Sequence, residues 1–170
     1  MPVEEIQRLC DVHAAVFKGS IEEIHRQQNP EEVPGHPIHT FKLENAEIEK
    51  LINSEIKQQL ELYKSGDTTE SLKKLKDGFQ RLWEIDRHYS RKENLLFPYL
   101  EKYGITAPPK VMWGVDDEIR AGIKEVNSIL SDSVENRDIF SEKSEEAVNK
   151  VIEMIFKEEN ILFPMALDTL

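Results

Sequence analysis

Apolar residues recur at helical spacing along almost the whole chain and divide it into long segments. In the first of these, Ile38, Phe41, Ile48 and Ile52 keep the period of about 3.6 residues that is typical of an amphipathic helix. The sustained alternation of apolar and polar residues that would indicate strands is absent. Prolines, glycines and capping side chains mark where the segments begin and end. They predict four helices: Pro37 to Gly66, Asp67 to Tyr103, Thr106 to about Asp132, and about Ser141 to Leu170.

Short connections between long helices favour antiparallel neighbours. We therefore predict an all-α fold, an up-down-up-down four-helix bundle formed by residues 36–170. Residues 1–30 carry a shorter apolar pattern that breaks near Gly19, and we expect an N-terminal helical segment there. Because a segment this short cannot bury its own apolar stripe, we expect it to pack on the bundle.

The charge of the chain limits its partners. Against 22 Lys and Arg there are 33 Asp and Glu, so the formal net charge is −11. A surface for nucleic acid must neutralise phosphates, so we expect neither nucleic acid nor an anionic membrane as a partner. The N-terminal residues lack the basic and apolar regions of a secretory signal, which favours a cytoplasmic protein. The single cysteine, Cys10, cannot form an internal disulfide.

One motif occurs twice, 66 residues apart. The pattern Glu-Asn-x-Leu-Phe-Pro runs from Glu93 to Pro98 and again from Glu159 to Pro164. Each proline lacks the N–H that would bond to the carbonyl four residues before it, so a kink is expected beside each glutamate. A carboxylate kept beside the same Leu-Phe-Pro in both copies suggests a role inside the bundle, although a shared helix-ending device also explains the repeat.

Histidines supply the other candidates for chemistry. His88 precedes Glu93 by five residues, which places the two side chains about 140° apart around a helix and about 7.5 Å apart along it. Both can then flank one inward-facing point, as ligands do in metal-binding helix bundles. The alternative is that His88 fills a buried polar position and Glu93 is solvated. His36 and His39 lie three residues apart on one helix face, at the distance of a ligand pair, but histidines near a helix start are also commonly exposed.

These residues resemble the hemerythrin-like, or HHE cation-binding, family, and more closely its bacterial and archaeal branch linked to PAS sensor domains. The resemblance implies a bundle that holds two iron ions, with ligands from all four helices, and that binds dioxygen or a related diatomic molecule. His88 and Glu93 match one ligand-bearing family helix, and Glu159 matches the carboxylate of the last one. Asn45, Asp116 and Met154 stand where the family usually has histidine. The N-terminal segment resembles the last part of a small helical domain that precedes the bundle in these relatives.

From the spacing and the resemblance together we predict a metal site with the ligands His36, His39, His88, Glu93, Asp116 and Glu159. This oxygen-rich set suits iron, as a di-iron centre or a single ion, or manganese. The predicted function is a sensory or regulatory module that responds to oxygen, redox state or iron, with an adjacent PAS domain or a second copy of the chain as a further partner. The alternative is a metal-free bundle that serves as an interaction or connector domain. We do not expect an enzyme.

Overall fold

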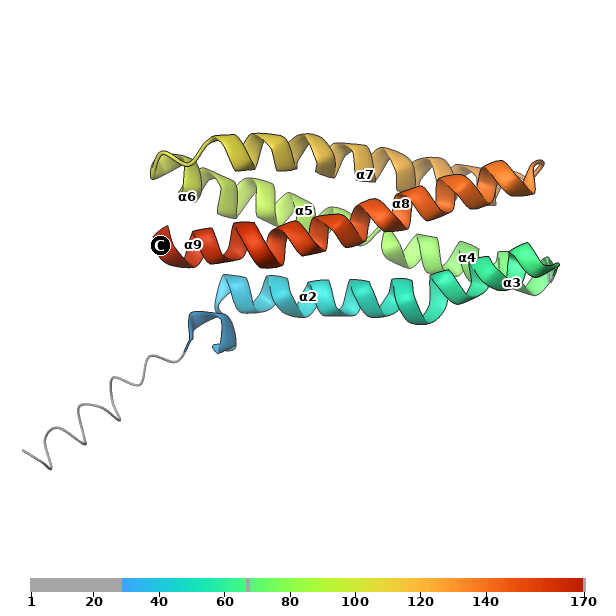
Figure 1. Ribbon diagram of the computed structural model, residues 1–170, viewed down its shortest axis with the longest axis horizontal. Helices are drawn as coiled ribbons and strands as arrows, with labels where there is room; N and C mark the ends of the chain where they lie inside the picture. The colour runs from blue at the N-terminus through green and yellow to red at the C-terminus, as the bar shows by residue number, and fades with distance from the viewer. Residues whose placement is uncertain (1–28, 67, 170) are drawn as a thin grey trace, which may run out of the picture.

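The computed structural model describes residues 29–66 and 68–169, and the N-terminal helical segment predicted for residues 1–30 lies almost wholly outside them. The described residues form four long helical rods that lie side by side along the molecule (Figure 1). The prediction of an all-α four-helix bundle is confirmed. The elements are η1 (Pro30–Glu32), α2 (Pro37–Leu51), η2 (Ile52–Ile56), α3 (Lys57–Ser65), α4 (Thr69–Leu82), α5 (Ile85–Arg91), η3 (Lys92–Leu96), α6 (Phe97–Lys102), α7 (Ala107–Ser131), α8 (Arg137–Lys157), η4 (Glu158–Leu162) and α9 (Phe163–Thr169).

The rods begin and end where local sequence signals place them. Pro37 is the first residue of α2, where its fixed φ suits a helix start. Gly66 and Gly104 have φ of 116° and 85° and close α3 and α6 in the left-handed conformation that glycine adopts without strain. The last rod begins at Arg137 and not near Ser141 as predicted, because the side chain of Asn136 accepts hydrogen bonds from the N–H groups of the next turn and caps it.

The sequence suggested one continuous helix for the second rod, but the structure divides this rod into α4, α5, η3 and α6. It tightens at Trp83 and Glu84, where backbone hydrogen bonds join residues three apart and α4 gives way to α5. The repeated motif has a further effect. The expected kink before each proline takes the form of a wide π-helical turn, η3 before Phe97 and η4 before Phe163, in which the phenylalanine N–H bonds to the carbonyl five residues back. An extra residue per turn shifts which side chains face inward.

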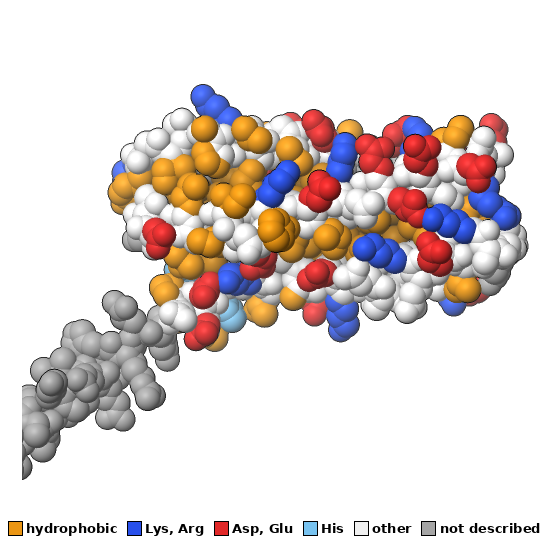
Figure 2. Space-filling view, in the orientation of Figure 1, with side chains coloured by type: hydrophobic (Ala, Val, Ile, Leu, Met, Phe, Trp, Pro, Cys, Tyr) orange, Lys and Arg blue, Asp and Glu red, His pale blue; other side chains and the backbone are white. Residues whose placement is uncertain are grey.

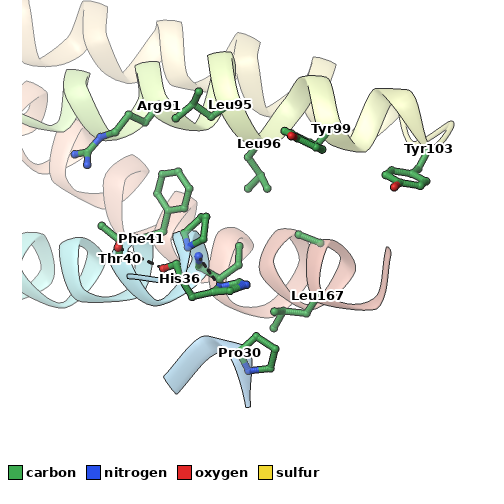
Figure 3. A pocket seen from close by; sticks show the side chains of 13 residues that line it. Pro30, His36, Thr40, Phe41, Arg91, Leu95, Leu96, Tyr99, Tyr103 and Leu167 are labelled. Carbon is green, nitrogen blue, oxygen red and sulfur yellow. Dashed lines mark hydrogen bonds between the residues drawn. The ribbon is translucent and has the colours of Figure 1, made fainter. Parts of the chain in front are cut away.

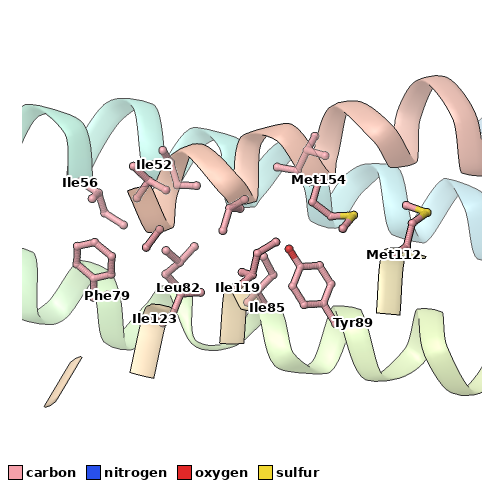
Figure 4. Packing of buried hydrophobic residues seen from close by; sticks show 14 of the residues in the cluster. Ile52, Ile56, Phe79, Leu82, Ile85, Tyr89, Met112, Ile119, Ile123 and Met154 are labelled. Atoms are coloured by element: carbon pink, nitrogen blue, oxygen red, sulfur yellow. The ribbon is translucent and has the colours of Figure 1, made fainter. Parts of the chain in front are cut away.

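Apolar side chains from all four rods fill the space between them (Figure 4). Ile52, Leu82, Ile119 and Met154 are each at most 1% exposed and meet near the middle of the bundle. Among the described residues, no helix is long and apolar enough to cross a membrane. The core is interrupted at one level by charged side chains, which make up the candidate site.

Candidate charged centre of the bundle

A lysine, an aspartate and a glutamate from three different rods meet inside the bundle. Lys92 begins η3, Glu158 begins η4, and Asp116 lies on α7, and all three are fully buried. The Nζ of Lys92 lies 2.8 Å from Asp116 Oδ1 and 2.5 Å from Glu158 Oε1. It also lies over the ring of Tyr89, 4.3 Å from the ring centre, where the π electrons attract a cation. The space between the two buried carboxylates is therefore occupied by an ammonium group.

His88 joins this group of charges to the surface. Its Nε2 lies 2.9 Å from Glu158 Oε2 and its Nδ1 lies 2.7 Å from Glu44 Oε2, so a protonated ring donates to a carboxylate at each end. Burial alone would lower the pKa of His88, but the hydrogen bonds to Glu158 and Glu44 outweigh burial and raise it above the usual 6.5. Glu44, on the first rod, is partly exposed, so the histidine connects the interior with solvent.

Glu158 is the most heavily bonded member of the group. It accepts hydrogen bonds from Lys92, from His88 and, at 3.0 Å, from the side chain of Asn45. Burial would raise the pKa of Glu158, but the neighbouring charges of Lys92 and His88 lower it to about 2. Asn45 is itself 1% exposed, and through it the first rod also contacts this carboxylate. All four rods thus contribute to one network, the charged centre, which consists of Glu44, Asn45, His88, Lys92, Asp116 and Glu158.

Asp116 is held less completely than Glu158. Burial raises its pKa from 3.8 to about 7, and the nearby Lys92 ammonium only partly opposes this effect. One ammonium is shared by two buried carboxylates, so the less well bonded of the two keeps a proton more readily. Asp116 Oδ2 has no hydrogen-bond partner within the described part of the chain.

Two of the six predicted ligands, His88 and Asp116, belong to the charged centre, Glu159 contacts it only through Asn45, and the other three do not reach it. Glu93 is bound by both terminal nitrogens of Arg120, at 2.7 and 3.0 Å. Glu159 is partly exposed and lies 3.2 Å from Asn45 Nδ2 and 3.8 Å from Lys42 Nζ. The expected convergence of Glu93 and Glu159 on His88 is therefore not what the structure shows. In each copy of the motif, the π-helical turn directs inward the residue just before the glutamate, which is Lys92 in the first copy and Glu158 in the second.

His36 and His39 have local roles at the start of the first rod. His36 is the N-cap of α2, and its Nδ1 accepts the N–H of Ile38 at 3.2 Å. The Nδ1 of His39 lies 2.8 Å from the backbone carbonyl of Glu31, to which it donates. Each ring is therefore engaged with nearby backbone and does not reach the charged centre.

The sequence did carry a signal for the residues that were missed. Lys92 falls in the apolar stripe Ile85, Tyr89, Leu96 and Leu100 at a spacing of three and four residues, and all four neighbours in that stripe are buried. Glu158 occupies the same kind of position in the last rod. The two residues are also equivalent in the repeat, since they lie 66 positions apart. Equivalent positions with opposite charges thus form a pair in the core.

The donor set of the charged centre does not fit the predicted metal. The Lys92 ammonium lies between the two buried carboxylates, and a metal ion there would have to displace it and leave its charge unpaired in the core. Within residues 29–66 and 68–169, no three His, Cys, Asp or Glu side chains are placed so that they could hold one ion.

An apolar groove lies at one end of the molecule, away from this network. It has a volume of about 660 Å³ and lies between the start of α2, the segment from η3 to α6, and α9 (Figure 3). Phe41 and Leu96 form its interior, and Leu95, Tyr99 and Tyr103 stand on one wall with more than half of each side chain exposed. Figure 2 shows apolar side chains gathered at this end and charged side chains over the other.

Comparison with known families agrees with this architecture. The model of the hemerythrin HHE cation binding domain matches residues 36–166, which is most of the chain. A family of unknown function (DUF438) matches residues 1–23. No curated protein matches the chain. With four antiparallel rods and a charged centre between them, the chain belongs to the hemerythrin HHE cation-binding domain family.

Proposed function

We propose that this chain is a helical interaction or connector module that works without a bound metal ion. One observation carries the proposal: the core position between the carboxylates of Asp116 and Glu158 is taken by the ammonium of Lys92. Buried charges are stable only when they are paired and hydrogen-bonded, and here they pair with one another. The module needs no further cation to fold, and we assign it no catalytic role.

The apolar groove supports a role in binding another helical segment. Its wall of Leu95, Tyr99 and Tyr103 leaves large apolar side chains in contact with water, a feature that marks interaction sites on small domains. Pro30 lines the groove, so the segment that leads into the first rod lies beside the groove. We propose an apolar helix of a neighbouring domain as its partner.

Iron-dependent sensing of oxygen or redox state is the second candidate, favoured by the description of the family as cation-binding. His88, Asp116 and Glu158 are side chains of the type that bind iron or manganese. In this case the ion would have to move Lys92 away from both carboxylates.

Metal analysis separates the two candidates. The protein is purified without chelator, loaded with ferrous iron under anaerobic conditions, freed of unbound metal, and measured for metal per chain and for melting temperature. We expect well under one metal ion per chain and the same melting temperature with iron and with EDTA. One or two ions per chain together with a higher melting temperature would overturn the proposal and favour the sensor.

A further inference from the structure

The surroundings of Lys92 Nζ are those of a bound cation. Two carboxylate oxygens from different rods lie at 2.5 and 2.8 Å, and the rings of Tyr89 and Phe97 lie 4.3 and 5.9 Å from it. The second oxygen of Asp116 is buried in the same place and has no partner in the described part of the chain. One ammonium therefore lies between two buried carboxylates, and one oxygen of Asp116 is left without a partner among the described residues.

The backbone presents the two oppositely charged partners in the same way. Lys92 and Glu158 are each the first residue of a π-helical turn, and each carbonyl accepts the N–H of the phenylalanine five residues later. Such turns are rare and occur often at functional sites. Lys92 and Glu158 are therefore both directed into the core from the start of a π-helical turn.

We propose that the Lys92 ammonium occupies the place of a metal ion between Asp116 and Glu158, and that these two carboxylates are closed to metal while the ammonium is present. The ligand class is a hard divalent ion such as Mn²⁺ or Fe²⁺, because the donors are carboxylate oxygens, to which Lys92→Glu would add a third carboxylate. This inference rests on the proposed metal-independent function. It adds that independence from metal is due to the side chain of Lys92, which forms ion pairs from the second rod to the third and the fourth.

Replacing Lys92 tests the role of its charge. In Lys92→Met the side-chain volume is kept and the ammonium is lost, so Asp116 and Glu158 are left in the core without their shared cation. We expect the equilibrium constant for unfolding to rise about a hundredfold or more. The matched control is Lys42→Met, which removes a partly exposed lysine paired with Glu31 and Glu159 and should change this constant less than about fivefold.

Charge inversion tests the metal site itself. Lys92→Glu places a third carboxylate beside Asp116 and Glu158, and we expect this variant to be unfolded or barely stable in EDTA. With Mn²⁺ it should refold, bind about one ion per chain and melt at a higher temperature, whereas wild type and Lys42→Glu should not respond to Mn²⁺. Lys92→Gln, which is neutral, should fold more readily than Lys92→Glu and should bind Mn²⁺ more tightly than wild type.

The results separate this inference from the proposed function. Mn²⁺ or iron bound stoichiometrically by wild type overturns the metal-independent function. If wild type is metal-free and neither Lys92→Glu nor Lys92→Gln takes up Mn²⁺ under refolding conditions, the function stands and the latent site is refuted. Equal stability of Lys92→Met and wild type would show that the ammonium does not join the rods.

Discussion

Arg120 holds Glu93 through two parallel hydrogen bonds, from Nη1 to Oε1 at 2.7 Å and from Nη2 to Oε2 at 3.0 Å. The same guanidinium donates to Asp86 at 2.7 Å. These carboxylates raise the pKa of Arg120 further above its usual value. The forked pairing fixes Glu93 beside α7 and leaves the interior position to its neighbour Lys92.

Removing this arginine should destabilise the bundle. Arg120→Met leaves the carboxylate of Glu93, which is 5% exposed, without its partner, and we expect the free energy of unfolding to fall by about 3 kcal/mol. Urea unfolding followed by circular dichroism measures the change. The control is Arg87→Met, whose pair with Glu84 is exposed, and its effect should stay within about 0.5 kcal/mol. Similar effects of the two variants would contradict a structural role for the fork.

Stability should decrease as the pH rises from 5 to 8. The pKa of Asp116 is about 7 in the folded chain and 3.8 by reference, so between these values the folded state binds more protons and loses stability with rising pH. The raised pKa of His88 acts in the same direction above 6.5. We expect a loss on the order of 2 kcal/mol. Glu158, whose pKa is lowered from 4.5 to about 2, contributes stability that disappears only when the pH falls below 4.5.

The variant Asp116→Asn isolates the aspartate in this profile. An amide imitates the protonated acid at every pH, so the variant should lose little stability between pH 5 and 7 and keep the decline above 6.5 that His88 causes. Unfolding free energies of both proteins at five pH values give the comparison. A variant curve parallel to that of wild type would rule out the assignment to Asp116.

Two helical glycines should respond in opposite ways to alanine. A Cβ at Gly78 would lie 2.9 Å from Cγ1 of Ile56, so Gly78→Ala forces two rods apart and should cost about 1 to 2 kcal/mol in spite of its better helix propensity. A Cβ at Gly114 meets no described atom within 4 Å, and Gly114→Ala should raise stability by roughly 0.5 to 1 kcal/mol. Thermal melts of the two variants test the close approach; stabilisation by both would contradict it.

His36 should act as a helix cap and not as a metal ligand. His36→Ala removes the acceptor for the Ile38 N–H and should lower stability by about 1 kcal/mol, whereas His36→Asn, which keeps a capping oxygen, should restore it. Chemical denaturation of the three proteins in EDTA and in iron checks this. If the asparagine variant were as weak as the alanine variant and wild type alone gained from iron, the histidine would be a ligand after all.

The sequence by itself determined the rods and their ends. Pro37, Gly66 and Gly104 act through their own backbone, and the apolar stripes report burial at a period set by the helix. Helix ends and buried faces of this kind can be predicted from residues that are close together in the sequence. The sequence also pointed to His88, through its spacing from Glu93, and to Asp116, through the family resemblance, and both lie in the charged centre.

Only the tertiary structure decided which of two adjacent charges faces inward. Lys92 and Glu93 differ by one position, as do Glu158 and Glu159, and a regular helical period did not separate them. The π-helical turns shift the phase of each rod, and Arg120, from a third rod, draws Glu93 aside. A buried charge is stable only beside its partner, and the partners of Lys92 lie 24 and 66 residues away along the chain. The pairing is therefore fixed by the packing of the rods.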